Sequence, residues 1–188
     1  AEEFREMRER EGGAWVFTSA TLSSAGRFDL FKQRLGIGEC VERTWESPFN
    51  YWEQGCFYLP QMPPPANNTA VHTHNVIEKV WPLINAAGGR TFVLCTSLAA
   101  VRAAADELQA RLEANGNPYP LFVQGDGPKM RLIEEFRAHG NAVLVGSMSF
   151  WEGVDVKGEA LSLVVIDKIP FAPPNDPVMM ARSRAVEA

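Results

Sequence analysis

The chain has 188 residues, of which 46% are hydrophobic and 22% are charged, and its formal net charge is −5. This length allows one domain with a substantial core, or one domain with an appendage. A domain that holds nucleic acid tightly by itself is usually basic, so this acidic chain would need a local basic patch or a partner. No apolar run reaches the roughly 18 residues of a transmembrane helix, and the first residues are not a signal peptide. We therefore expect a cytoplasmic protein without a membrane partner.

Metal and disulfide chemistry find little support in the sequence. The three cysteines, Cys40, Cys56 and Cys95, lie far apart and form no CxxC pair, so neither a zinc site nor a disulfide framework is predicted. His72 and His74 are two residues apart, but they have no cysteine or carboxylate pair nearby, and we predict no metal site there.

The first third of the chain is irregular in pattern. Its predicted elements, in order, are a short helix over 1–11, a strand over 14–17, a helix over about 25–35 that Ser23 or Ser24 caps and Gly36 ends, and a strand over 56–59. Four prolines between residues 60 and 68 predict an extended loop.

From residue 69 onward, strands and helices alternate. The predicted helices cover about 70–87, 98–114, 128–138 and 177–188, and the predicted strands cover 90–95, 121–123, 142–146 and 161–166. The 98–114 helix has the clearest signal, because apolar residues recur at spacings of three and four from Leu98 to Leu112. Such alternation predicts an α/β fold, with a mostly parallel sheet and helices on both faces.

Polar residues follow each of these strands and would meet at one edge of a parallel sheet, where open α/β sheets bind ligands. They are Thr96-Ser97, Gln124-Gly125, the stretch from Ser147 to Asp155, and Asp167-Lys168. The stretch Gly146–Gly158 carries two serines, two carboxylates and three glycines in 13 residues. Hydroxyls and backbone N–H groups in such a row suit phosphates.

Simpler interpretations remain open for these residues. Thr96 and Ser97 could hold a phosphate or only cap the following helix. Glu152 and Asp155 could orient water, a ribose hydroxyl or an arginine, or could serve as helix-start carboxylates. Gly153 allows a sharp turn or the close approach of a phosphate.

The sequence lacks several motifs that would identify a self-contained nucleotide enzyme. It has no GxxxxGK[ST] phosphate loop, no Asp-Glu-x-His box and no GxSxG nucleophile elbow. Gly125 and Gly127 begin a dinucleotide fingerprint, but Met130 replaces its third glycine, which argues against a stand-alone nucleotide-binding protein of Rossmann type.

Five segments together resemble a known family. Thr18–Leu22 resembles motif III of superfamily 2 helicases, Val93–Ser97 resembles motif IV, Gln124–Asp126 with Pro128 resembles the segment after it, Ser149–Leu161 resembles motif V, and Val164–Phe171 is similar to the strand and turn that follow. The chain is thereby similar to the XPD/DinG-type DNA helicases, in their YoaA/DinG branch.

The resemblance implies a RecA-like three-layer α/β sandwich that acts as the second motor domain of an ATP-driven 5′-to-3′ DNA helicase in repair or replication. Residues 1–188 would form this domain, with 1–22 near the boundary to a first motor domain. ATP and Mg²⁺ would bind in the intact protein and an iron–sulfur cluster could belong to the first domain, whereas this chain alone would bind none of them. Single-stranded DNA, the first motor domain and a replication or repair protein are the implied partners.

The resemblance also assigns roles to residues. Glu152 and Asp155 would be catalytic, Ser149 and Gly153 would face the nucleotide, Thr96, Ser97, Gln124 and Ser147 would bind nucleic acid, and Ser19, Ala20 and Thr21 would couple nucleotide state to DNA movement. Phe150, Trp151 or Phe171 could stack on a base or pack in the core, and Lys129, Arg131 and Lys168 could contact phosphate or solvent.

Two further expectations concern the chain as a whole. The phosphate loop, the acidic box and motif VI of the family are not found in it, so we expect no ATPase or helicase activity from this chain alone. The alternative function is a protein-interaction module, in which the proline-rich loop at 60–65 and the last helix dock a replication or repair protein.

Overall fold

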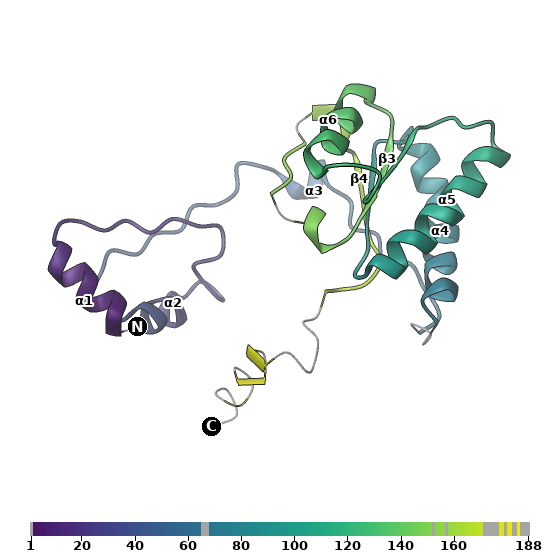
Figure 1. The fold of residues 1–188 in the computed structure, drawn as a ribbon. Helices are drawn as coiled ribbons and strands as arrows, with labels where there is room; N and C mark the ends of the chain where they lie inside the picture. The colour runs from purple at the N-terminus through teal and green to yellow at the C-terminus, as the bar shows by residue number, and fades with distance from the viewer. Residues whose placement is uncertain are drawn as a thin grey trace. The chain divides into compact units, whose positions relative to one another are not determined.

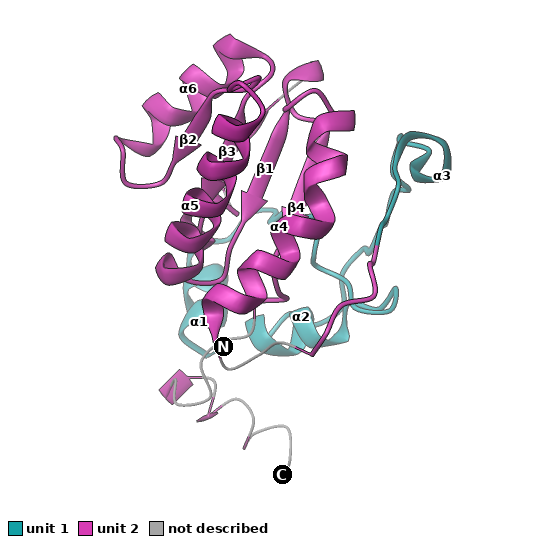
Figure 2. Cartoon of the chain, turned by 90° about the vertical axis from the view of Figure 1, so that its right-hand side faces the viewer, with its two compact units in different colours: residues 1–58 teal, residues 59–188 magenta. Residues whose placement is uncertain are grey.

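The computed structural model describes residues 2–64, 68–151, 153–156 and 158–170, together with residues 177, 178, 180, 181 and 184. The chain divides into two compact units, Ala1–Tyr58 (unit 1) and Leu59–Ala188 (unit 2), which Figure 2 distinguishes by colour. Within the described residues, no helix is long and apolar enough to cross a membrane.

Unit 1 contains three helices and no strand among its described residues. The helices are α1 (Glu2–Glu11), α2 (Asp29–Leu35) and α3 (Tyr51–Gln54). The strands predicted over 14–17 and 56–59 are wrong. A strand needs a neighbour to pair its backbone groups, and the described pairing in this unit is a single bridge between Ser24 and Arg27. The apolar residues of the 14–17 segment instead form an aromatic cluster, in which Trp15 lies 5.8 Å from Phe4 and Phe17 lies 5.5 Å from Phe31, measured between ring centroids.

Helix α2 begins later than predicted. The backbones of Ser24 and Arg27 pair with each other in a turn, so the helix starts after this turn and the predicted cap by Ser23 or Ser24 is wrong. The N-cap is Phe28, whose side chain has no polar atom and makes no cap. The helix ends at Gly36, as predicted, and this glycine has the left-handed conformation that favours glycine.

Unit 2 confirms the predicted α/β class. Its elements are α4 (Thr69–Ala86), β1 (Thr91–Leu94), α5 (Leu98–Ala114), β2 (Leu121–Val123), α6 (Lys129–His139), β3 (Val143–Gly146), the short 3₁₀ turns η1 (Met148–Phe150) and η2 (Gly158–Ala160), and β4 (Leu163–Ile166). The four strands form one sheet in the order β2-β3-β1-β4, and every neighbouring pair is parallel. The described residues of the predicted last helix, among them Pro177 and Arg184, are helical.

Helices cover both faces of the sheet (Figure 1). On one face, Val93, Val143 and Val165 pack against buried residues of α4 and α5. Figure 2 shows these two helices lying side by side across this face. On the other face, Phe92 and Leu144 pack against α6, whose Phe136 lies 4.7 Å from Phe92 between ring centroids. Successive residues of β1, β2 and β3 therefore serve opposite cores, as the pleat of a strand requires, whereas Val164 and Ile166 of β4 are exposed.

Gly89 allows the chain to enter β1 close to the segment before β3. Its φ is +80°, and a Cβ atom at this position would lie 2.2 Å from the backbone oxygen of Asn141. The neighbouring Thr91 N–H donates to the Ala142 oxygen at 3.0 Å. A side chain at position 89 would thus push apart the two segments that begin the central strand pair.

We predict that Gly89→Ala destabilises the protein by about 3 kcal/mol or more, because it adds a backbone clash to the cost of about 1–2 kcal/mol for a left-handed alanine. Gly88→Ala is the matched control, since Gly88 has a φ of +65° but a Cβ there would approach no atom closer than 4.0 Å. Urea unfolding followed by circular dichroism measures both. Equal losses in the two variants would contradict the close contact.

Helices α4 and α5 are also joined by an ion-pair group around Glu107. Its carboxylate accepts a hydrogen bond from Arg111 Nε at 2.9 Å, and it lies 2.8 Å from Arg111 Nη2 and 3.2 Å from His74 Nδ1. Burial by itself would raise the pKa of Glu107, but the hydrogen bonds from Arg111 and His74 outweigh it and hold the pKa below its ordinary value.

Because the folded-state pKa of Glu107 is lowered, its contribution to stability is present above the unfolded pKa of about 4.3 and is lost as the pH falls through the folded value. We predict that Glu107→Gln lowers stability at pH 7 by about 0.5–1 kcal/mol, the range for a partly exposed pair, and that the difference from wild type disappears at low pH. Unfolding measured from pH 7 to pH 3 tests this, with Glu134→Gln on exposed α6 surface as the control. A difference that is independent of pH would refute the assignment.

Candidate functional site

The carboxyl ends of the four strands lie at one edge of the sheet because all the strands run in the same direction. Leu94 is in register with Gly146 on one side and with Ile166 on the other. The hydrogen bonds continue one residue beyond the strands: Cys95 N–H donates to the Gly146 oxygen at 2.8 Å and Asp167 N–H donates to the Leu94 oxygen at 3.1 Å. The residues that follow the strands are thereby held next to one another by backbone pairing.

Gln124 and Ser147 are joined directly at this edge. The Gln124 Oε1 atom accepts a hydrogen bond of 2.6 Å from the Ser147 backbone N–H, and Ser147 is buried. The oxygen of the amide is therefore committed to the start of the loop after β3. Because the amide is planar, this contact also sets the direction in which its NH₂ group can donate.

Thr96 and Ser97 have different local roles. The Ser97 side chain accepts from Ala100 N–H at 3.2 Å and caps α5, so the simpler interpretation holds for its oxygen, although its hydroxyl proton can still be donated. The Thr96 hydroxyl donates to Asp167 Oδ2 at 3.4 Å, across the gap between the ends of β1 and β4.

Asp167, to which the sequence assigned no role, lies at the centre of a half-buried polar group. Its backbone oxygen lies 3.1 Å from His72 Nε2, and its second carboxyl oxygen, Oδ1, is buried without a hydrogen-bond partner in the described part of the chain. Burial raises the pKa of Asp167, opposed by the Lys168 charge and by the backbone N–H groups of Lys168 and Thr96. The only signal in the sequence was the position of Asp167 at a strand end.

Cys95 is a core residue rather than a reactive thiol. Burial, with the nearby Asp167 carboxylate, raises the pKa of Cys95 to about 12, so the thiol stays protonated and is a poor nucleophile at neutral pH. Within the described residues, no group of three or more His, Cys, Asp or Glu side chains could hold a metal ion.

The loop after β3 begins with the turn η1 and is anchored by Phe150. This ring is 3% exposed and packs with the α6 cluster, so core packing, and not base stacking, is the outcome for Phe150. A Cβ atom at Gly146 would lie 2.8 Å from the same ring, so glycine is needed there for the ring to fit. Trp151 is half-buried against the same cluster, and its Nε1 is buried without a partner among the described residues.

The other described site residues of this loop are at the surface. Ser149, Gly153 and Asp155 are exposed, and Gly153 has a φ of +66°. Glu152 and Phe171 lie outside the described residues. Arg131 donates to the Asp126 backbone oxygen at 2.9 Å and Lys129 donates to the Ser149 backbone oxygen at 2.5 Å, so both cations have partners within the chain.

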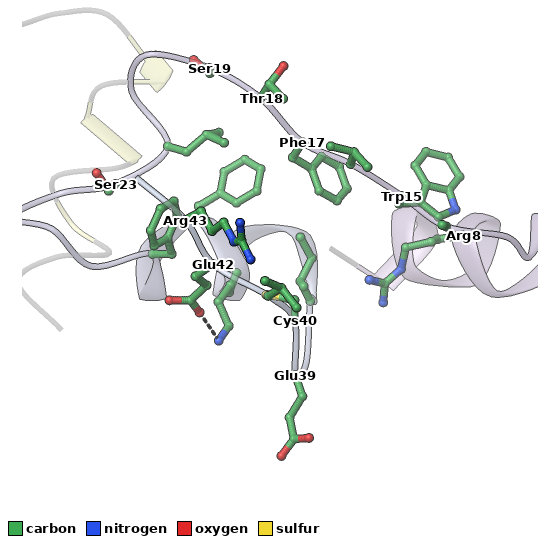
Figure 3. Close-up of a pocket in the computed structure, with 18 of the residues that line it drawn as sticks. Arg8, Trp15, Phe17, Thr18, Ser19, Ser23, Glu39, Cys40, Glu42 and Arg43 are labelled. Carbon is green, nitrogen blue, oxygen red and sulfur yellow. Dashed lines mark hydrogen bonds and ion pairs between the residues drawn. The ribbon is translucent and has the colours of Figure 1, made fainter. Parts of the chain in front are cut away.

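The predicted coupling residues Ser19, Ala20 and Thr21 lie in unit 1 and are exposed. Thr21 N–H donates to Ser19 Oγ at 3.2 Å and so closes a small turn. Ser19 and Ala20 also line a cavity of about 1290 Å³ within this unit, together with aromatic, charged and small residues such as Trp15 and Arg43. Figure 3 shows Trp15, Phe17, Thr18 and Ser19 following one another along one wall of this cavity.

A sheet of parallel strands with helices on both faces, and polar groups gathered at the carboxyl ends of its strands, is an open α/β architecture that binds ligands at this edge. Residues 80–188 match the helicase C-terminal domain family, and the chain belongs to this family, which makes its α/β fold RecA-like.

The relatives of the chain come from the predicted YoaA/DinG branch, and the resemblance is thereby confirmed. The chain is 42% identical over 97% of its length to the ATP-dependent DNA helicase YoaA of Haemophilus influenzae and 40% identical over 97% to that of Escherichia coli, and it covers 28% of each relative. It is 39% identical over 92% of its length to the ATP-dependent helicase DinG of Mycobacterium tuberculosis and covers 26% of it. The chain thus spans little more than a quarter of the length of these relatives.

We predict that Asp167→Asn raises the melting temperature at pH 7. The raised folded-state pKa means that ionised Asp167 is unfavourable in the folded state, and that this penalty is relieved as the pH falls through the folded value. The gain from the variant should therefore shrink toward pH 4. Thermal melts across this range measure it, with Asp106→Asn on the exposed surface of α5 as the control. A lower melting temperature for Asp167→Asn at pH 7 would contradict the prediction.

Proposed function

We propose that this chain is the second RecA-like motor domain of an ATP-dependent DNA helicase that moves 5′ to 3′ along single-stranded DNA in repair or replication. One observation carries the proposal: in a chain of this family, three neighbouring strand ends bring Thr96, Ser97, Gln124 and Ser147 to one edge of the sheet. Hydroxyl, amide and backbone N–H groups are the donors that phosphate oxygens need.

In this proposal, DNA binding changes the contact between Thr96 and Asp167. A hydroxyl that holds a phosphate has to donate its proton, and the Thr96 hydroxyl now donates to Asp167 Oδ2. The DNA strand therefore binds only when the Thr96 hydroxyl turns away from Asp167 and toward the phosphate. The Gln124 side chain needs no such change, because its oxygen stays on Ser147 N–H while its NH₂ group donates to the DNA.

ATP would supply the energy for movement by binding between this domain and the first motor domain. Ser149, Gly153 and Asp155 fit one wall of such a site, because they offer an exposed hydroxyl, a turn without a side chain and an exposed carboxylate. The sequence has no phosphate loop, so we assign the phosphates and Mg²⁺ chiefly to the first domain. An iron–sulfur cluster needs four ligands, usually cysteines, and this chain has three, of which Cys95 is buried. We therefore place any cluster in the first domain as well.

The experiment that tests the proposal is ATP hydrolysis by the full-length protein with and without single-stranded DNA. We predict that wild type is stimulated by the DNA and that Asp155→Ala loses this stimulation at least tenfold. Its melting temperature should change little, because substitutions of exposed residues usually alter stability by less than about 0.5 kcal/mol. Glu159→Ala, an exposed carboxylate in the same loop, is the matched control.

If Asp155→Ala behaves like wild type, Asp155 is only a turn residue. If wild type shows no DNA-dependent hydrolysis, the helicase proposal fails.

Exposed aromatic residues favour a second candidate, the protein-interaction module. Trp45, Trp52 and Phe57 of unit 1 are 80%, 98% and 91% exposed, and large exposed apolar side chains often mark an interaction surface. A module of this kind would bind a replication or repair protein and hardly any single-stranded DNA. Fluorescence anisotropy with a labelled oligonucleotide separates the two candidates.

A further inference from the structure

Lys129 contacts the loop after β3 at two places and lies near a third. Its Nζ atom donates to the Ser149 backbone oxygen at 2.5 Å and lies 5.5 Å from the centroid of the Phe150 ring. A Cβ atom built on Gly153 would lie 3.9 Å from the same Nζ. One ammonium group thus spans the loop from its first turn to the glycine before Asp155.

Helix stability does not explain a lysine at this position. Lys129 is the first residue of α6, where the helix dipole is positive and a cation is unfavourable. The first turn of α6 contains no acidic residue, and its N-cap Pro128 makes no side-chain hydrogen bond to offset this. A carboxylate or a serine would suit the start of the helix better, so the contact with the loop accounts for the lysine.

The helix that carries Lys129 is a rigid support. Leu132, Ile133 and Phe136 of α6 are buried against the sheet and against Phe150. The loop is therefore held to the same helix in two ways, by an apolar contact at Phe150 and by a charged hydrogen bond at Ser149. The second contact controls the segment that continues through Gly153 to the exposed Asp155.

We propose that Lys129 is a positioning residue, which holds the loop of residues 147–155 in the conformation that links DNA binding to ATP hydrolysis; the link to hydrolysis rests on the proposed function. Both groups that it meets, a backbone oxygen and the face of an aromatic ring, are electron-rich and attract a cation. Arginine can make both contacts. Methionine has a similar length but carries no charge, so it can make neither contact.

Hydrolysis by the full-length protein at increasing concentrations of a single-stranded oligonucleotide tests the link. Lys129→Met should lower the DNA-stimulated kcat about tenfold, the scale expected for one charged hydrogen bond, while the DNA concentration for half-stimulation stays within about twofold. Lys129→Arg should restore most of the rate. Lys79→Met, which removes the same charge from the exposed surface of α4, should behave like wild type.

Hydrogen–deuterium exchange of the peptide that covers residues 147–156 tests the positioning without any activity. Lys129→Met should speed exchange of this peptide about tenfold, and Lys129→Arg and Lys79→Met should not. Melting temperatures and exchange of the α6 core show whether Lys129→Met is folded. If it is not folded, the comparison of Lys129→Arg with wild type decides. An arginine that leaves exchange and kcat unchanged supports a role for the cation, whereas one that speeds exchange and lowers kcat refutes it.

The remaining outcomes separate this inference from the proposed function. Unchanged exchange in folded Lys129→Met overturns the positioning role. A weakened affinity for DNA with an unchanged kcat also overturns it, since Lys129 would then be an ordinary phosphate contact. If wild-type hydrolysis ignores DNA, the proposed function fails and the exchange experiment alone decides the role of Lys129.

Discussion

The pairing of β1 with β3 on one side and β4 on the other is the constraint on which the rest of unit 2 depends. Parallel pairing places all strand ends at one edge and sends the connecting helices to the two faces. Gly89 enables the pairing, because only a residue without a Cβ atom fits beside the Asn141 backbone. The positions of Thr96, Ser147 and Asp167 relative to one another then follow from backbone hydrogen bonds alone.

The two side-chain contacts at this edge differ in strength. The hydrogen bond of 2.6 Å between Gln124 and Ser147 is short, whereas the 3.4 Å contact of Thr96 with Asp167 is long for a hydroxyl donor, whose usual distance is about 2.7–2.8 Å. A long hydrogen bond is weaker than a short one. The proposed DNA contact therefore requires only the weaker of the two contacts to break, and Gln124 can stay where it is.

The acidic composition of the chain is reflected in the polar groups at this edge of the sheet. Lys129 and Arg131 lie near it, but the structure uses them to hold the chain itself, at the Ser149 and Asp126 backbone oxygens. In the proposed function, the neutral donors at the strand ends, with Lys168 beside them, are the groups that meet the phosphate backbone. Hydroxyl and amide donors bind phosphate by direction rather than by net charge.

Local sequence patterns were sufficient to predict the secondary structure of unit 2, but they were insufficient for unit 1. In unit 2 the apolar pattern of each element predicts which of its residues are buried. Examples are the helical spacing from Leu98 to Leu112 and the short apolar runs at 121–123 and 142–146. The strand predicted over 14–17 has the same apolar character, yet it forms an aromatic cluster, because a strand exists only where a second strand pairs with it. The sequence by itself determined which residues follow each strand, and so which polar groups reach the edge. Only the tertiary structure decided the pairs they form there, Gln124 with Ser147, Thr96 with Asp167 and Lys129 with Ser149, because each pair joins residues 20 to 71 positions apart through side-chain geometry that no local pattern records.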